Sequence, residues 1–229
     1  MGRFFDMDSP LMRILNRVAD LMILNLLMIV CCIPVITIGA ATTAMHYVIL
    51  KMVRDEEGYL VKGFFKSFAA NFKQATLIWL LMLVVIVVYI GDAVIFSFSG
   101  ITFPKPLVVA VIAVGVVLLM VGIYVFPLLA RFENSIRNTI KNAALIAIGN
   151  LPKTILMVIL YAVPLVISYF SSYAMLFVFL FGISAPAYGA AMLYSNIFKK
   201  FEPEVEVVPD MEFTVDVGER EEDADGETE

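Results

Sequence analysis

Four long stretches without a charged side chain constrain this sequence more than any other feature. They run from Leu21 to Leu50, Gln74 to Gly91, Pro106 to Ala130 and Thr154 to Phe198, with lengths of 30, 18, 25 and 45 residues. About 20 apolar residues in a helix cross a bilayer. Only 16% of the residues are charged, against about a quarter in soluble domains. The sequence therefore excludes a soluble globule and predicts an all-α, polytopic transmembrane helix bundle.

The lengths of these stretches indicate six membrane segments. The second stretch continues past Asp92 and gives one helix over about 74–98. The third stretch is long enough for one crossing by itself. The fourth stretch divides at the polar turn 168–172 into two helices. The first is long for one crossing and short for two. Pro34 and Gly39 lie near its middle, where proline would break the helix and glycine would permit a reversal. We interpret it as a hairpin of two short helices, either crossing or re-entrant; the alternative is one kinked span and five crossings.

The distribution of Lys and Arg predicts the orientation, because short cytoplasmic loops are enriched in both. Basic residues precede the first stretch, lie between the first and second and between the third and fourth, and follow the last. The connection between the second and third has only Lys105, and the turn 168–172 has none. Both termini and both basic loops are therefore expected on the cytoplasmic side.

The net charge changes sign after Lys200. Residues 1–200 contain 15 Lys and Arg against 8 Asp and Glu, whereas residues 201–229 contain 1 against 13. We therefore expect a transmembrane helical domain over 1–200 and an acidic, disordered cytoplasmic tail over 201–229. Nucleic acid is not an expected partner, because the basic residues are accounted for as membrane flanks.

Two cytoplasmic amphipathic helices are predicted within the basic loops. Residues 60–74 place phenylalanines on one helical face and lysines between them: Phe64, Phe68 and Phe72, with Lys62 and Lys66. Residues 131–149 repeat the pattern, with Phe132 on the apolar face and Arg137 on the polar one. Such helices either lie in the headgroup layer, bound to membrane lipid and packed under the bundle, or dock a protein partner. The pattern leaves both interpretations open.

Few polar side chains lie inside the predicted spans. Asp92 and His46 form the candidate intramembrane polar site, since an ionisable group at that depth is a functional candidate. A hydrated acid at the outer interface and a histidine bonded to a neighbouring helix are the alternatives. Asp20 beside Arg17 predicts an ion pair. A single histidine does not suffice for a metal site, and neither a P-loop nor a G-x-S-x-G or H-E-x-x-H motif occurs, so no enzymatic activity and no cofactor are expected.

An ordered set of short strings covers residues 1–201. The strings are DSPLM at 8–12, PVITIGA at 34–40, KMVRDEEGY at 51–59, FKSF at 65–68, NFKQAT at 71–76, PLLARFEN at 127–134 and NIFKKF at 196–201. In this combination the chain resembles the YesL-like family of bacterial integral membrane proteins, a domain of unknown function. The family brings no catalytic residues, and the acidic tail lies outside the resemblance.

The resemblance implies a setting rather than a chemistry. The resemblance implies a multi-pass protein of the bacterial cell membrane. Members of that family resemble accessory genes found beside sugar ABC transporters, which implies a role near carbohydrate uptake. Its expected role is that of an accessory or regulatory component of carbohydrate uptake, with permease or ATPase subunits as partners. From the residues alone, a small-solute transporter or channel is the alternative, with the break at Pro34 and Gly39 near its site. The oligomeric state is not predicted.

Overall fold

The computed structural model describes residues 10–56, 58–98, 104–170, 173 and 175–202, and within these ranges it contains helices and short connections but no strand. The elements are α1 (Pro10–Cys31), the 3₁₀ helix η2 (Val35–Thr37), α2 (Ile38–Val53), α3 (Leu60–Phe98), α4 (Lys105–Arg131), α5 (Ile136–Gly149), α6 (Leu151–Phe170), α7 (Met175–Phe181) and α8 (Ser184–Phe198). The all-α prediction is confirmed over these ranges. The predicted tail from residue 203 onward lies outside the described residues.

Candidate membrane spans account for most of the described chain. Five helices are long and apolar enough to cross a bilayer, namely α1, α2 (with η2), α3, α4 and α6. The pair α7 and α8 makes a sixth candidate, bent by 50° at a short break. The sequence expectation of several helices long and apolar enough to cross a bilayer is therefore confirmed, and the last predicted segment is a broken helix rather than a continuous one.

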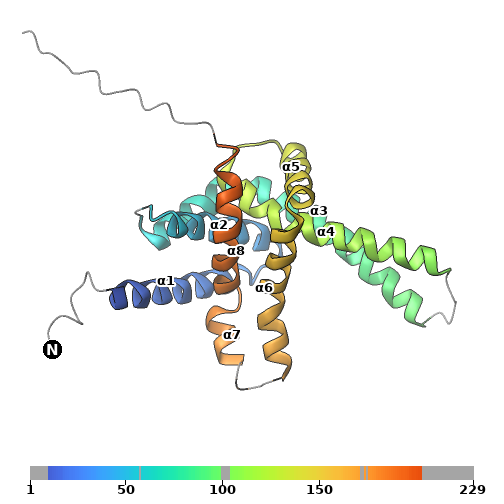
Figure 1. The fold of residues 1–229 in the computed structure, drawn as a ribbon, viewed down its shortest axis with the longest axis horizontal. Coiled ribbons are helices and arrows are strands. Elements are labelled where there is room, and N and C mark those ends of the chain that lie inside the picture. Colours follow the sequence, from blue (N-terminus) through green and yellow to red (C-terminus); the bar gives the residue numbers. More distant parts are fainter. Residues whose placement is uncertain (1–9, 57, 99–103, 171–172, 174, 203–229) are drawn as a thin grey trace, which may run out of the picture.

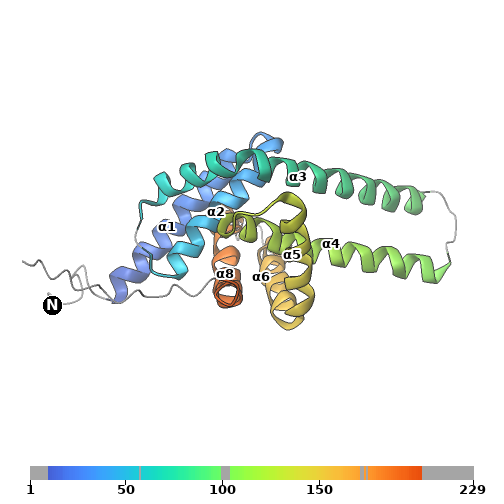
Figure 2. The ribbon, with the colours of Figure 1, turned by 90° about the horizontal axis from the view of Figure 1, so that it is seen from above.

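The helices radiate from a centre at α2 (Figures 1 and 2). The hairpin of α3 and α4 extends to one side and α1 to the other, whereas α6, α7 and α8 run crosswise to both. The predicted bundle is thus not a set of aligned helices. Aliphatic side chains on the α3–α4 hairpin stay 60% or more exposed, for example Val84, Val87 and Val109. A surface of this kind suits lipid as its solvent, because soluble proteins rarely expose large apolar areas.

The chain reverses between α1 and α2 at Pro34, as the proline predicted. The Thr37 hydroxyl donates to the carbonyl oxygens of Cys31 and Pro34, at 2.5 and 2.6 Å. Trp79 on α3 donates its indole N–H to the carbonyl oxygen of Val35 at 2.8 Å. Backbone groups in hydrocarbon need partners within the protein, because water is absent there. These bonds therefore allow an irregular reversal at the end of two apolar helices.

Gly39 does not form this reversal, so its predicted role in the turn is wrong. It lies in the first turn of α2, where that helix crosses α3. A Cβ atom at this position would lie 2.4 Å from the carbonyl oxygen of Ala75 and 2.6 Å from the Cβ of Trp79. Glycine is required here because α2 and α3 approach each other too closely for a side chain.

The predicted amphipathic helix at 60–74 and the following span form one continuous helix, α3. Its 39 residues extend about 58 Å at 1.5 Å per residue, nearly twice the hydrocarbon thickness of about 30 Å. Phe64 is fully buried, and Phe68 and Phe72 pack partly buried against the core. Lys62 and Lys66 are exposed on the other face. The phenylalanine face therefore packs inside the protein and is not an open docking surface.

The second predicted amphipathic helix begins later than the pattern suggested. Residues 132–135 are not helical, and α5 begins at Ile136 with Ser135 as its N-cap, whose hydroxyl accepts from the Asn138 N–H at 3.4 Å. Phe132 leaves the helix and packs edge-on against Phe198, with ring centres 5.5 Å apart. Arg137 is exposed on α5. Phe132 therefore ties the α4–α5 connection to the end of α8.

Candidate functional site

The two residues of the predicted intramembrane polar site lie apart. His46 on α2 is buried, and its Nδ1 lies 3.1 Å from the hydroxyl of Tyr194 on α8. Asp92 is exposed near the C-terminal end of α3. The structure therefore places His46 in a contact between two helices and leaves Asp92 outside that contact.

A cavity of about 760 Å³ lies next to His46, mainly between α2, α3 and α4. Its lining is almost entirely aliphatic, and the α3 residues that line it end at Ile90, before Asp92. The polar side chains that reach it are Thr42, His46, Tyr89 and Tyr161. A space of this volume and character suits an apolar molecule.

A buried carboxamide closes the break between α7 and α8. Asn25 on α1 is fully buried, and its Oδ1 accepts hydrogen bonds from the N–H groups of Ile183 and Ser184 at 3.0 and 2.9 Å. Its Nδ2 donates to the carbonyl oxygen of Phe179 at 2.8 Å. The first N–H groups of a helix have no partner within the helix. Asn25 therefore caps α8 from a different helix.

Sequence reasoning missed Asn25, although the residue carries a signal. It is the only Asn or Gln in the 30-residue stretch from Leu21 to Leu50. A carboxamide in a membrane span seeks a hydrogen-bond partner on another helix. The pattern could have identified the residue, but nothing local to it identifies α8 as the partner.

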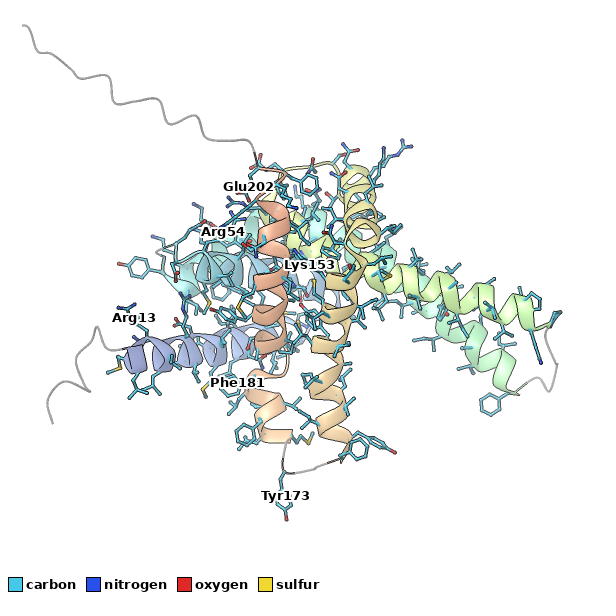
Figure 3. All side chains as sticks on the ribbon, viewed as in Figure 1. Arg13, Arg54, Lys153, Tyr173, Phe181 and Glu202 are labelled. Atoms are coloured by element: carbon cyan, nitrogen blue, oxygen red, sulfur yellow. The ribbon has the colours of Figure 1, made fainter. Side chains whose placement is uncertain are left out.

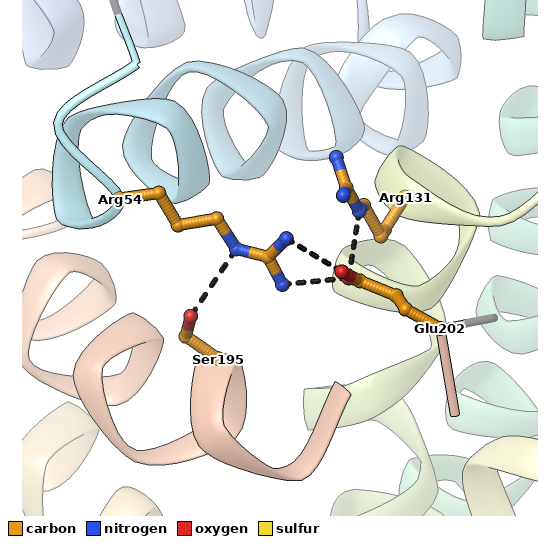
Figure 4. A network of polar contacts seen from close by, with 4 residues as sticks. All are labelled: Arg54, Arg131, Ser195 and Glu202. Carbon is orange, nitrogen blue, oxygen red and sulfur yellow. Dashed lines mark hydrogen bonds and ion pairs between the residues drawn. The ribbon is translucent and has the colours of Figure 1, made fainter. Parts of the chain in front are cut away.

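Three helix ends meet at one carboxylate (Figure 4). Arg54 follows α2, Arg131 ends α4, and Glu202 follows α8. The two terminal nitrogens of Arg54 donate to the two carboxylate oxygens of Glu202 at 2.9 and 2.7 Å, and the Nε of Arg131 donates to one of them at 2.9 Å. The Arg54 Nε also donates to the Ser195 hydroxyl on α8, at 3.3 Å. We call these four residues the arginine clamp.

Charge and burial make the arginine clamp stronger than an ordinary surface ion pair. The Arg54 side chain is 9% exposed and that of Glu202 is 22% exposed. The hydrogen bonds from Arg54, and then those from Arg131, lower the pKa of Glu202 from 4.5 to about 2, against the opposing effect of burial. A bidentate arginine–carboxylate pair combines charge with matched geometry. Arg54 and Glu202 lie together on the same side of the molecule as the end of α8 (Figure 3).

A second ion pair joins the beginning of α1 to the end of α2. Arg17 binds the carboxylate of Asp55, which follows α2 in a left-handed conformation with a φ of 54°. The expected partner, Asp20, is thus not the residue to which Arg17 forms its salt bridge. The pair places the N-terminal part of α1 beside the C-terminal end of α2.

A smaller cavity of about 460 Å³ lies between α2 and the first turns of α3. Its charged lining residues are Asp20, Lys51, Glu56, Lys62 and Lys66. Two of the predicted interface residues, Lys62 and Lys66, therefore border a polar hollow rather than a flat face. Among the residues that the structure describes, no three His, Cys, Asp or Glu side chains gather as a metal site would require.

Comparison with known proteins gives one match. The family model described as "Protein of unknown function, DUF624" matches residues 21–93, about a third of the chain. The matched region runs from α1 through most of α3 and includes Asn25, the reversal at Pro34 and Arg54. No curated protein and no solved structure matches the chain. The similarity therefore links this region to an uncharacterised domain, and the YesL-like resemblance stays a prediction.

Proposed function

We propose that six segments cross the bacterial cell membrane, with both termini in the cytoplasm. The pair of Arg17 and Asp55 supports a hairpin of α1 and α2, because one kinked span would place these two residues on opposite sides. Transmembrane helices tilt by up to about 40° from the bilayer normal. The crosswise helix groups can therefore both cross if they tilt in opposite directions.

Labelling of single cysteines tests this topology. Leu11 and Lys105 are exposed, and each is changed to Cys after Cys31 and Cys32 are replaced by Ala. Six crossings predict that a membrane-impermeant maleimide labels Lys105→Cys in intact cells and labels Leu11→Cys only after permeabilisation. Labelling of both in intact cells would support five crossings instead.

For the function, we propose a non-enzymatic accessory or regulatory component of an ABC-type carbohydrate uptake system. The arginine clamp is the observation that carries this proposal, because it gathers the ends of α2, α4 and α8 on the basic side of the protein. Such a fixed, charged face suits contact with the cytoplasmic parts of a transporter. The sugar class rests on the sequence resemblance alone. The chain has no nucleotide-binding motif, so a partner would supply ATP hydrolysis.

Partner capture tests this role with variants chosen from exposed positions. Lys199, Lys200 and Phe201 are exposed directly before Glu202, so Lys199→Glu, Lys200→Glu and Phe201→Ala together alter the face at the clamp without removing any of its four residues. Val84→Ala, an exposed position on α3, is the control. A C-terminal tag in native membranes should enrich a sugar permease or its ATPase with wild type and Val84→Ala, and several-fold less with the triple variant. Equal enrichment by all three proteins, or none, would contradict the proposal.

A second candidate, a small-solute transporter or channel, is favoured by the cavity beside His46. Proteoliposomes with wild type and His46→Gln would test it with radiolabelled sugars. The second candidate would be supported if wild type takes up sugar and His46→Gln lowers this uptake at least tenfold. Asp92→Asn is the control, because Asp92 lies outside the cavity lining. Absence of uptake by wild type would count against it.

A further inference from the structure

The arginine clamp has the composition of an anion-binding site whose occupant is part of the chain. Two guanidinium groups from different helices converge on one carboxylate. Guanidinium groups bind carboxylate and phosphate in the same bidentate manner. The Arg54 side chain is more than nine-tenths buried, and a buried charge without a partner is strongly destabilising. The site therefore requires an anion, but not Glu202 in particular.

The arginines of the site are placed by elements other than Glu202. Arg54 follows directly after α2 and its side chain is also bonded to the Ser195 hydroxyl, while the backbone of Arg131 belongs to the last turn of α4. Glu202 lies four residues beyond the last helical residue of α8, and its side chain is 22% exposed. A competing anion therefore meets an Arg54 side chain that Ser195 also holds, an arginine at the end of α4, and a partly exposed carboxylate that can leave.

The position of the site indicates the competing anion. Arg54 and Arg131 both lie at the ends of candidate membrane spans, which is where the phosphate groups of lipids lie. Basic pockets between helix ends on the cytoplasmic side bind anionic headgroups. The sequence after Glu202 contains 12 Asp and Glu against one Arg, so an anionic membrane surface repels it. Lipid phosphate and the acidic segment thus compete for the same arginines with opposite consequences for that segment.

We propose that Arg54 and Arg131 bind a phosphate group, supplied by the headgroup of an anionic phospholipid, in exchange for the Glu202 carboxylate. The exchange frees the chain after α8 from the ends of α2 and α4. The proposal rests on the membrane embedding of the chain and not on the sugar-uptake role. Its failure would therefore leave the partner proposal untouched.

The first test removes the resident anion. Purified full-length Glu202→Ala is titrated with short-chain phosphatidylglycerol, short-chain phosphatidylcholine or inorganic phosphate while its thermal unfolding is followed. Glu133→Ala, which removes an exposed acid from the α4–α5 connection, is the matched control. We expect Glu202→Ala to be stabilised by phosphatidylglycerol at a concentration at least tenfold lower than wild type or Glu133→Ala requires. Adding Arg54→Ala should abolish this gain.

Three outcomes of the titration would overturn the proposal. Equal responses of Glu202→Ala and Glu133→Ala would show that only the overall charge matters. A gain that survives Arg54→Ala would place the lipid elsewhere on the basic surface. A response to inorganic phosphate without a response to phosphatidylglycerol would refute the lipid as the source of the anion.

The second test keeps Glu202 and compares two lipid compositions. Phe201 is 59% exposed, so a spin label on Phe201→Cys, with Cys31 and Cys32 replaced by Ala, reports the motion of the chain beside Glu202. We expect slow motion in nanodiscs of phosphatidylcholine and fast motion in nanodiscs rich in phosphatidylglycerol. Arg54→Ala should give fast motion in both. The same slow motion of the wild-type clamp in both lipids would contradict the exchange.

Discussion

Replacing Asn25 tests whether the cap between helices holds the broken segment together. Asn25→Leu keeps the number and branching of the non-hydrogen side-chain atoms and removes all three hydrogen bonds that Asn25 makes at the break between α7 and α8. Two N–H groups and one carbonyl oxygen would then lack this partner in an apolar interior. The backbone at the break between α7 and α8 would then have to rearrange, or these three groups would remain without hydrogen bonds.

The size of the effect follows from the number of bonds. An unsatisfied buried group costs about 1–3 kcal/mol in soluble proteins, which would give a total of about 3–9 kcal/mol for three groups. Hydrogen bonds within membranes contribute less, on average about 0.6 and at most about 1.7 kcal/mol each, because the unfolded chain also finds partners there. We therefore expect Asn25→Leu to lower the free energy of unfolding by about 2–5 kcal/mol.

Reversible unfolding in mixed micelles with increasing denaturing detergent measures this change. The single tryptophan, Trp79, supplies a fluorescence signal from the α2–α3 crossing. Asn16→Leu is the control, because Asn16 lies on the same helix and is exposed. We expect it to change the free energy of unfolding by less than about 0.5 kcal/mol. If Asn25→Leu were as stable as Asn16→Leu, the cap would contribute nothing and our reasoning would be refuted.

Three further predictions concern other contacts. Gly39→Leu should destabilise by about 3 kcal/mol or prevent folding, because its side chain would meet the backbone of α3, whereas Gly91→Leu, with open space around it, should fold normally in size-exclusion chromatography. Trp79→Phe should cost about 1 kcal/mol in unfolding followed by circular dichroism, because it removes the donor to the reversal before α2. The pKa of the Glu202 carboxylate is about 2 in the folded state and 4.5 in the absence of these contacts. Its contribution to stability should therefore be fully present above pH 4.5 and be lost as the pH falls toward 2. Thermal unfolding of Glu202→Gln should lack this acid-dependent loss.

The positions of the spans could be predicted because they depend on local composition. A charge-free stretch of sufficient length is apolar whatever it packs against, and Pro34 lacks a backbone N–H in any fold. Proline alone does not fix a reversal, however, because Pro127 and Pro164 lie inside α4 and α6. The sequence also contains enough information to predict that α3 is one continuous helix. Neither Pro nor Gly interrupts the sequence between Gly63 and Gly91. The change from a basic to an apolar composition within that stretch suggests a boundary between two helices, but it marks a change of surroundings along one helix.

The contacts that define the candidate site could not be predicted in the same way. Asn25 bonds a backbone group 154 residues away, and Arg54 binds a carboxylate 148 residues away. One sequence contains no signal for which distant segments meet. The same limit explains why the surroundings of Phe64 could not be predicted. A helical stripe of phenylalanines has the same sequence pattern whether it faces lipid, a partner protein or the core of its own chain. Only the tertiary structure, in which Phe64 is fully buried, distinguishes these three cases.

The two irregular points of the fold bear on the choice between an accessory protein and a transporter. Transporters use broken helices to present free backbone N–H and carbonyl groups to a substrate or ion. Here the carbonyl oxygens at the reversal before α2 accept hydrogen bonds from Thr37 and Trp79. The N–H groups at the break before α8 donate to Asn25. Side chains of the protein thus occupy the backbone positions that a transported solute would need. At the arginine clamp, by contrast, the occupant is one carboxylate at the end of a chain, and a competing anion can displace it without breaking a helix.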